Sequence, residues 1–317
     1  MNGINCYFKI RITAPGTRRA WFSAPSAETE AIAEPRVARP GAQKKLNRVC
    51  LPPFFFLTLF AGNFSAQEKC GVKNSAFMFD EELQYKVIYN WGPIWLESAY
   101  AAFTVKPANL NGKACYLFNG SGSTYPKYDW FYKVRDVFET YVDTESLRPL
   151  KFKAEILEGS KNDRHTYVFN NSAKKVYTII NHGKAPVAID TVKINACSID
   201  VLTAIYFARN IDYSTCKVRD TIGISLILDG KLYPIYVRYL GKEVFTSKEL
   251  GKYNCIKFSP LLVEGSIFKK GEGMVVWVTN DKNKLPIYIE TPITVGTIKV
   301  KLVSYKALRN VEEAKIN

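Results

Sequence analysis

The stretch TIGISLILDGKLYPIYVRYL, residues 221–240, decides the fold class. Apolar side chains alternate with other residues on both sides of Asp229-Gly230, which is the strongest short signal for a two-residue hairpin turn. A period of two is typical of a strand that buries one face. The stretch therefore predicts an antiparallel hairpin. Its expected inward-facing residues are Ile222, Ile224, Leu226 and Leu228, followed by Ile235, Val237 and Tyr239.

The same alternation runs through most of the chain. GMVVWVTNDKNKLPIYIE (273–290) predicts a second hairpin that turns through residues 280–283, and TIKVKLVSY (297–305) alternates apolar residues with lysine, so one face is wet and the other buried. Asp, Asn and Gly turns separate the earlier apolar segments. Further strands are expected within 82–92, 100–106, 115–122, 136–159 and 165–183.

Only SIDVLTAIYFARNI (198–211) has a clear helical pattern. Ser198 is expected to cap its N-terminus, while Asp200 and Arg209 suit the positive and negative ends of the helix dipole. The fold class predicted from these patterns is all-β and mainly antiparallel, a large curved sheet or open β-barrel with one internal α-helix. The helix, over residues 198–210, is expected to pack on the concave side and to bury Val201, Ile205 and Tyr206 or their immediate neighbours.

Residues 44–67, KKLNRVCLPPFFFLTLFAGNFSAQ, have the three parts of a secretory signal. Three cations precede the 14-residue apolar run 49–62, and a short polar exit follows it. A membrane span needs about 20 apolar residues, and a buried helix would show polar positions at helical spacing. We therefore expect a cleaved signal peptide over 44–66, with an uncleaved anchor and a core segment as the alternatives.

Residues 1–43 are rich in Ala, Pro, Arg and Glu and show no sustained period, so they are expected to be a disordered extension or sequence upstream of the true start. Residues 67–317 then form a single exported β domain of the periplasm or cell envelope. Of 44 Lys and Arg and 29 Asp and Glu, nine and three lie in residues 1–66, which leaves a net charge of +9. Because these cations are scattered, nucleic acid is not an expected partner.

Five cysteines lie in residues 67–317: Cys70, Cys115, Cys197, Cys216 and Cys255. Export permits disulfides, and the odd number leaves at least one thiol. Cys197 and Cys216 bracket the predicted helix, and a chain that returns along it could join them in a disulfide. Inert buried thiols are the other expectation. No pair has zinc-site spacing, so neither a metal nor another cofactor is expected.

His165 and His182 are the only histidines, and both lie near predicted hairpins, where we expect surface positions. No motif joins either of them to a nucleophile. Two carboxylate pairs could serve a glycosidase, but exposed strand edges produce such pairs routinely. They are Glu81 with Glu82 and Glu155 with Glu158. No catalytic residue is assigned.

The most distinctive stretch is TYPKYDWFYKVRDVFETYVDTESLRPLKF (124–152), which interleaves aromatic and charged residues. It resembles the core signature of the bacterial exported family catalogued as domain of unknown function 3108. The matching residues are Tyr128, Asp129, Trp130, Phe131, Val134, Arg135, Asp136, Phe138, Thr140, Tyr141, Val142, Asp143, Ser146, Leu147 and Pro149.

Residues 81–105 and 198–209 also resemble this family, through its opening strand pair and its helix, although Asp80 stands where the family has Gly. The resemblance spans about residues 77–305. It implies export and an all-β fold, and it implies no reaction.

Two readings of the aromatic stretch stay open. In the first, Arg135, Asp136 and Asp129 form a polar network that ties central strands together. In the second, aromatic rings and Arg side chains line a pocket, the rings stacking on an apolar ligand or sugar and Arg holding an anionic group. The candidate ligand-binding residues are Trp91, Trp95, Tyr125, Trp130, Arg135 and Arg209.

Two functions follow. We expect a non-catalytic envelope protein that binds a lipid or other amphiphile in an apolar pocket between the helix and the strands with Trp91, Trp95 and Trp130. The alternative is a hydrolase of envelope or extracellular polysaccharide, which needs two carboxyl groups about 5–10 Å apart in a cleft.

N-terminal sequencing of the protein recovered from its native envelope tests the export prediction. We expect the mature chain to begin at Gln67, because cleavage after Ala66 removes the apolar run. Any peptide from residues 1–43 in the mature protein contradicts this.

Overall fold

The computed structural model of the chain describes residues 72–130, 132–263, 271–293 and 296–316. The chain divides into two units, and every described residue lies in the one made of residues 1–12 and 68–317. The other unit, residues 13–67, is outside the described residues, and so are the expected N-terminal extension and signal peptide.

One sheet contains all sixteen strands of the part that the structure describes. The strands are β1 (Glu82–Trp91), β2 (Ile94–Leu110), β3 (Lys113–Thr124), β4 (Val134–Asp143), β5 (Pro149–Glu158), β6 (Lys161–Asn170), β7 (Lys175–His182), β8 (Ala188–Lys193), β9 (Ser198–Ile199), β10 (Thr221–Leu228), β11 (Lys231–Ser247), β12 (Gly251–Pro260), β13 (Val275–Thr279), β14 (Pro286–Pro292), β15 (Thr297–Lys306) and β16 (Lys315–Ile316). The predicted all-β class is confirmed.

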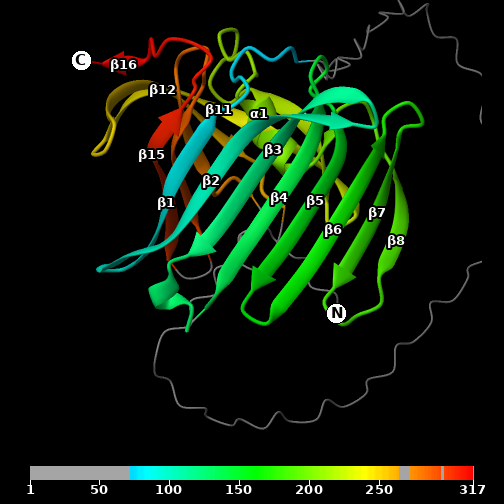
Figure 1. Cartoon of the computed structure of the whole chain (residues 1–317). Coiled ribbons are helices and arrows are strands. Elements are labelled where there is room, and N and C mark those ends of the chain that lie inside the picture. Colours follow the sequence, from blue (N-terminus) through cyan, green and yellow to red (C-terminus); the bar gives the residue numbers. More distant parts are fainter. Residues whose placement is uncertain (1–71, 131, 264–270, 294–295, 317) are drawn as a thin grey trace, which may run out of the picture. The chain divides into compact units, whose positions relative to one another are not determined.

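The strand order is β8-β7-β6-β5-β4-β3-β2-β1-β15-β14-β13-β12-β11-β10-β9, and β16 pairs with β12. Most neighbours in the sheet are therefore neighbours in sequence, as hairpins require, and the pairing of β1 with β15 joins the two runs. Only β9 and β10 pair in parallel among the described strands. Figure 1 shows β1–β8 as one wall with β11, β12 and β15 behind it.

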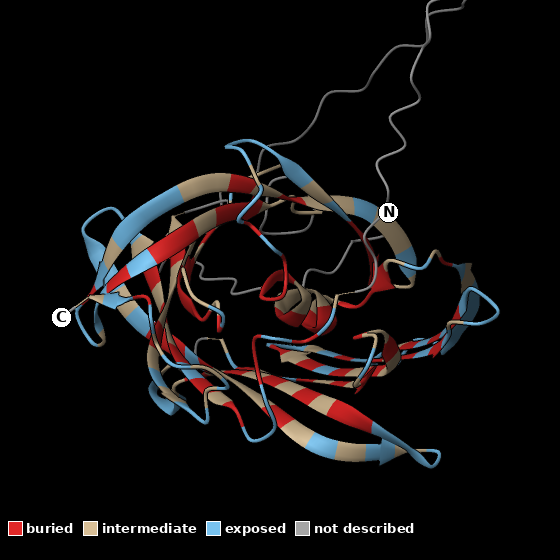
Figure 2. Ribbon diagram, turned by 90° about the horizontal axis from the view of Figure 1, so that it is seen from above, coloured by how far each residue is buried: buried red, intermediate tan, exposed pale blue. Residues whose placement is uncertain are grey.

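The sheet curves around a short helix, α1 (Val201–Ala208), which Figure 2 shows on the concave side. The backbone N–H of Gly230, in the turn between β10 and β11, donates to the Tyr167 hydroxyl on β6 at 3.3 Å. This contact places the β10–β11 turn against β6, although the two are far apart in the strand order. In the described part of the sheet, the two halves therefore meet through side-chain contacts and not through a continuous ladder of backbone hydrogen bonds.

The two predicted hairpins form as expected. Asp229 and Gly230 have φ values of 47° and 70°, the left-handed conformations that a type I′ turn needs at both central positions. Leu228 pairs with Lys231 directly across the turn. The other predicted turn, 280–283, lies between β13 and β14.

The helix is shorter than predicted, and its cap is Asp200, not Ser198. The Asp200 carboxylate accepts hydrogen bonds from the backbone N–H groups of Leu202 and Thr203, each at 3.0 Å. Ser198 instead lies in β9 and pairs with Ser225. Serine and aspartate are both good N-cap residues. Because Ser198 is paired in β9, it cannot cap the helix, and Asp200 does so instead. Val201 and Ile205 are half-buried, whereas Tyr206 is buried.

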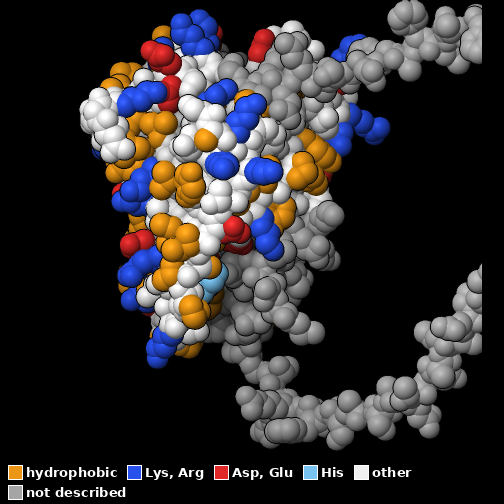
Figure 3. Space-filling view, turned by 90° about the vertical axis from the view of Figure 1, so that its right-hand side faces the viewer, with side chains coloured by type: hydrophobic (Ala, Val, Ile, Leu, Met, Phe, Trp, Pro, Cys, Tyr) orange, Lys and Arg blue, Asp and Glu red, His pale blue; other side chains and the backbone are white. Residues whose placement is uncertain are grey.

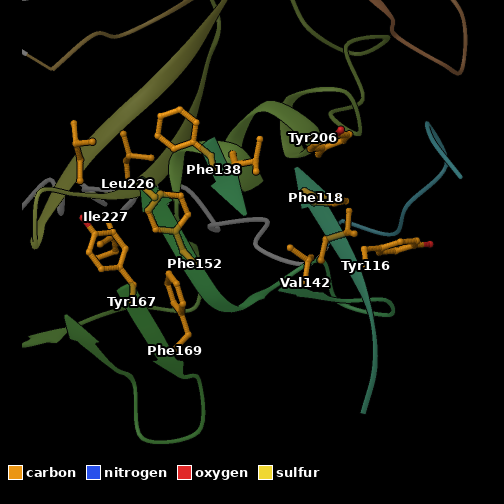
Figure 4. Packing of buried hydrophobic residues seen from close by; sticks show 14 of the residues in the cluster. Tyr116, Phe118, Phe138, Val142, Phe152, Tyr167, Phe169, Tyr206, Leu226 and Ile227 are labelled. Carbon is orange, nitrogen blue, oxygen red and sulfur yellow. The ribbon is translucent and has the colours of Figure 1, made fainter. Parts of the chain in front are cut away.

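Tyr206 packs α1 against the aromatic core on the inner face of the sheet. Its ring stacks on Phe118 with centroids 3.9 Å apart and meets Phe77 edge-on at 5.0 Å. Phe152 and Tyr167 stack further along the same inner face at 5.0 Å. Figure 4 shows Phe118, Phe138, Phe152 and Tyr167, from the successive strands β3 to β6, and Tyr206 from α1. Aromatic pairs of this geometry contribute about 0.5–1.5 kcal/mol each beyond their buried area.

The expected Cys197–Cys216 disulfide is wrong. Cys197 is disulfide-bonded, but its partner is none of the other described cysteines, because Cys115, Cys216 and Cys255 are thiols. The Cys216 thiol lies 3.7 Å from the Asp212 carbonyl oxygen. Within the described residues, no helix has the length and apolar character needed to cross a membrane.

A buried ion pair joins the end of α1 to the chain just before β1. The Arg209 guanidinium donates to both carboxylate oxygens of Glu81, at 2.6 and 2.8 Å. It also donates to the Asn283 carbonyl oxygen at 3.1 Å and to that of Ala76 at 3.4 Å. Burial lowers the pKa of Arg209, but the Glu81 carboxylate outweighs burial and raises it. The guanidinium therefore stays charged inside the protein.

Replacing Arg209 with alanine leaves the Glu81 carboxylate buried without its counter-charge. We expect Arg209→Ala to lower the free energy of unfolding by about 3–5 kcal/mol, measured by urea denaturation with far-UV circular dichroism. The matched control is Arg238→Ala, because Arg238 pairs with Glu272 at 2.7 Å while both side chains stay more than a quarter exposed. The control should cost much less, because water screens an exposed ion pair. Equal losses in the two variants would contradict the role of burial.

Candidate functional site

An apolar cavity of about 330 Å³ lies between α1 and the strands around it. Side chains from β1, β2 and β10–β15 line it together with α1 and the chain that follows β12. Among the described residues that line it there is no Asp, Glu, Lys or His, and Arg209 carries the one formal charge. The cavity can therefore hold an apolar group, and its walls carry almost no side chains that could bind a polar group or act in catalysis.

Arg209 marks the end of the cavity at which β1 begins. Its guanidinium also lies 5.7 Å from the ring centroids of both Phe77 and Tyr206. Burial raises the pKa of the Tyr206 hydroxyl well above its usual range, and nearby Glu81 adds to this. The structure thus places the predicted site residue Arg209 in the cavity wall, with its donors directed at protein acceptors.

The opposite end of the sheet carries the predicted tryptophans. β1 ends at Trp91, and Asn90 beside it pairs with Thr297 at the start of β15, so these termini share one end of the sheet. We call it the Trp91 end. The register places the start of β4 and the ends of β3 and β12 there too. In Figure 1 the β1–β2 hairpin projects from this end.

The three tryptophans do not line the cavity. Trp91, Trp95 and Trp130 are 45%, 58% and 84% exposed. The ammonium group of Lys299 lies 4.5 Å from the Trp95 ring centroid. The expectation that these rings line the pocket with the helix is wrong, because Trp91 and Trp95 are exposed at the ends of β1 and β2 and Trp130 is exposed in the connection between β3 and β4. Contact with a ligand at the Trp91 end stays a prediction.

Tyr125 and Arg135 hold the connection between β3 and β4, which includes the short 3-10 helix η1 (Pro126–Tyr128). The Tyr125 hydroxyl donates to Glu97 at 2.7 Å. Arg135 donates to the Asp129 carboxylate at 2.6 Å and to the Thr124 carbonyl oxygen at 3.2 Å. Neither residue lines the cavity. The predicted network forms here, without Asp136.

Asp136 points to the inner face and belongs to a second cluster. Ionisable side chains gather where β4–β7 reach the Trp91 end, on the same face as Phe138 and Phe152. We call them the inner ionisable cluster. Its members are Asp136, Glu158, Lys161, Asp163, His165 and His182, and Asp229 faces it from the β10–β11 turn.

His165 is the clearest departure from the sequence prediction. It is 1% exposed, not at the surface, whereas His182 is exposed as expected. Its Nδ1 atom lies 3.3 Å from the Tyr167 hydroxyl and 3.8 Å from a carboxylate oxygen of Asp229. Burial lowers the pKa of His165 to about 4, although the Asp163 carboxylate acts to raise it. The alternation in NDRHTYVFN (162–170) was the signal, because it places Asp163, His165 and Tyr167 on one face.

Burial also raises the pKa of Asp136, to about 7, and neighbouring Glu158 adds to this. One oxygen of Asp136 accepts from the Leu157 N–H at 3.1 Å. The other has no hydrogen-bond partner among the described residues. Buried carboxylates on adjacent strands cannot both stay charged at low cost.

The carboxylate pairs noted in the sequence do not converge. Glu81 is buried against Arg209, while Glu82 is near Lys106 and Lys306. Glu155 is 72% exposed and Glu158 is 2% exposed, so they point to opposite faces of β5. Neither pair can act on one substrate.

Comparison with known proteins gives a family. The model of the family described as "Protein of unknown function (DUF3108)" matches residues 84–303. The chain therefore belongs to this family. Comparison with curated proteins finds no match. Among solved structures, the chain is similar to a β-barrel-like protein of domain of unknown function DUF1849 from Brucella abortus, with a TM-score of 0.48 and 9% identity over 73% of this chain and 99% of that one.

Neutralising Asp136 tests how much the buried charge of this carboxylate destabilises the folded protein. A raised acid pKa means that the folded state binds the proton more tightly, so stability falls as pH rises from about 4 to 7 and stays reduced above that. A shift of three units corresponds to about 4 kcal/mol as an upper bound. We expect Asp136→Asn to raise the free energy of unfolding by about 2–4 kcal/mol at pH 8 and by much less at pH 5, measured by urea denaturation.

The control for this variant is Asp190→Asn, since Asp190 is an exposed carboxylate on β8. It should leave stability unchanged at both pH values. A loss of stability in Asp136→Asn at pH 8 would show that the carboxylate is charged and favourably paired, and would contradict the raised pKa.

Proposed function

We propose that this member of the DUF3108 family is an exported, non-catalytic protein of the cell envelope that holds the apolar part of a lipid or other amphiphile. The observation that carries the proposal is the cavity of about 330 Å³, whose wall is almost entirely apolar. A soluble domain normally fills its interior to the density of an organic crystal. A space of this size within the range of ligand pockets favours a bound molecule over a packing defect.

The chemistry of the wall selects the kind of ligand. Aliphatic side chains of β10, β13 and β15 line the cavity together with the aromatic rings of Phe103 and Phe258. Transfer of one methylene from water into such surroundings contributes about 0.8 kcal/mol. An acyl chain of about ten methylenes would gain roughly 8 kcal/mol. The cost of association and of ordering the chain is subtracted from this gain, so it is an upper bound. Polar ligands would gain nothing from this wall.

The position of the Arg209–Glu81 pair suggests how the ligand lies. The Arg209–Glu81 pair fills the end near β1's first residue, so the polar part of an amphiphile is better placed toward the Trp91 end. Trp91 and Trp95 are exposed there, and Lys299 lies beside Trp95. Tryptophan and lysine side chains suit the boundary between lipid and water. Trp130, Tyr125 and Arg135 lie at the same end as further candidates for contact.

The polysaccharide hydrolase finds less support. It needs two carboxyl groups in a cleft that a sugar can enter. No carboxylate is among the described residues of the cavity wall. Asp136 and Glu158 do lie on adjacent strands, but they are 1% and 2% exposed, so a sugar ring cannot reach them. Binding of a lipid or other amphiphile is therefore the function we propose.

Filling the cavity tests the proposal. Ala204 lies on α1 and lines the cavity, so Ala204→Phe puts a ring where the ligand would lie. We expect native mass spectrometry of the wild-type protein from its own envelope to find a co-purifying lipid, and the variant to lose it. Binding of an environment-sensitive fluorescent fatty acid should weaken by more than about tenfold.

The matched control is Ala188→Phe, which adds the same ring at an exposed position on β8. It should bind the fluorescent fatty acid as the wild type does. Far-UV circular dichroism of each variant shows whether the fold is kept. Equal binding by a folded Ala204→Phe variant and the wild type would refute the cavity as the ligand site.

A further inference from the structure

Two strands bring three metal-ligating side chains together inside the inner ionisable cluster. Asp163, His165 and His182 each offer one ligand atom, and these atoms all lie within 4.8 Å of one another. Asp163 and His165 are two residues apart on β6, so they point to the same face. His182 at the end of β7 pairs directly with Asp163 in the sheet register. The convergence is thus fixed by the backbone.

Two of the three side chains are buried and the third is exposed, so an ion bound by them would be screened from water but could still enter from solvent. Asp163 and His165 are 3% and 1% exposed, so their donor atoms are largely screened from water. The His182 side chain is 45% exposed and gives a route from solvent. Figure 3 shows this side of the protein, with a histidine at the surface among apolar and basic side chains. The imidazole planes of the two histidines are nearly perpendicular, with centroids 5.7 Å apart.

We propose that Asp163, His165 and His182 form a binding site for a divalent transition-metal ion, with zinc as the best match. Two imidazole nitrogens and one carboxylate oxygen are a common zinc donor set, and they leave a fourth position for water or another ligand. Bond lengths of about 2.0–2.2 Å require tetrahedral ligand atoms roughly 3.3–3.5 Å apart. His182 Nδ1 already lies 3.0 Å from a carboxylate oxygen of Asp163. The widest spacing in the trio, at most 4.8 Å, would have to contract by up to about 1.5 Å when an ion binds.

Neighbouring groups fit the same assignment. The Asp229 carboxylate lies 3.8 Å from His165 Nδ1, where it can orient the ring or complete the coordination, as outer carboxylates do for zinc-bound histidines. Asp229 belongs to the β10–β11 turn, so the ion would tie that turn to β6 and β7. The competing arrangement is an ion pair, because Lys161 Nζ lies 3.2 Å from the Asp163 carboxylate. Metal binding would require Lys161 to give up that oxygen.

Cobalt titration distinguishes the metal site from the ion pair. The untagged chain is stripped with a chelator and titrated with Co²⁺, whose visible absorption reports a tetrahedral site. We expect one equivalent to bind with the visible bands of a tetrahedral ion, without the near-ultraviolet band of a thiolate ligand, and Zn²⁺ to displace it. His182→Ala should weaken Co²⁺ binding by more than about a hundredfold, since even the loss of an outer partner weakens binding by about 10–100-fold.

Two further variants complete the test. Asp163→Asn should weaken binding as His182→Ala does, and His182→Ala keeps the experiment valid if the buried Asp163 change prevents folding. Asp190→Asn, on the exposed β8 strand, should bind as the wild type. The proposal is overturned by the absence of a saturable equivalent, by a thiolate band, or by unchanged binding in a folded His182→Ala variant. Each result is independent of whether a lipid occupies the cavity.

Discussion

The ion pair between Arg209 and Glu81 joins the end of α1 to the start of β1, and the arrangement of the inner face depends on it. A sheet of sixteen strands has a wide apolar face to cover, and the eight residues of α1 cover only part of it. A helix of two turns has little stability of its own. Its position must therefore come from tertiary contacts, which Asp200 provides at one end and Arg209 at the other.

The same pair explains why a cavity can persist. Charged groups inside a protein are stable only where each finds a counter-charge and hydrogen bonds, and Arg209 finds both beside Glu81, Ala76 and Asn283. This satisfied network fixes the C-terminal end of α1 beside the chain that precedes β1. The apolar cavity lies between the helix fixed in this way and the curved sheet.

The inner face changes character along β4–β7. Phe152 and Tyr167 share one row of the sheet, Phe138 and His165 share the next row, and Asp136 and Asp163 share the row after that, toward the Trp91 end. Alternation guarantees that all six point inward, but it does not distinguish a ring from a carboxylate. The apolar cavity is lined by other strands, β1, β2 and β10–β15, so the cavity and the inner ionisable cluster are separate regions suited to ligands of opposite chemistry.

Much of the fold could be predicted from local patterns. The Asp229-Gly230 turn, the alternating strands and the single helix followed from short-range geometry, because each depends on residues within a few positions of one another. The helix cap did not, since Ser198 and Asp200 are both good caps and the pairing of β9 with β10 decided between them. The spacing of the cysteines in the sequence also did not identify the disulfide partner of Cys197.

The candidate site was less predictable. Aromatic density drew attention to Trp91, Trp95 and Trp130, yet these residues lie at strand ends or in a connection and are exposed. The sequence by itself determined which side chains share a face, because a strand repeats every two residues. Only the tertiary structure decided which faces meet: the pairing of β1 with β15, the β10–β11 turn over β6, and His182 beside Asp163 depend on contacts between distant segments, and no local period records them.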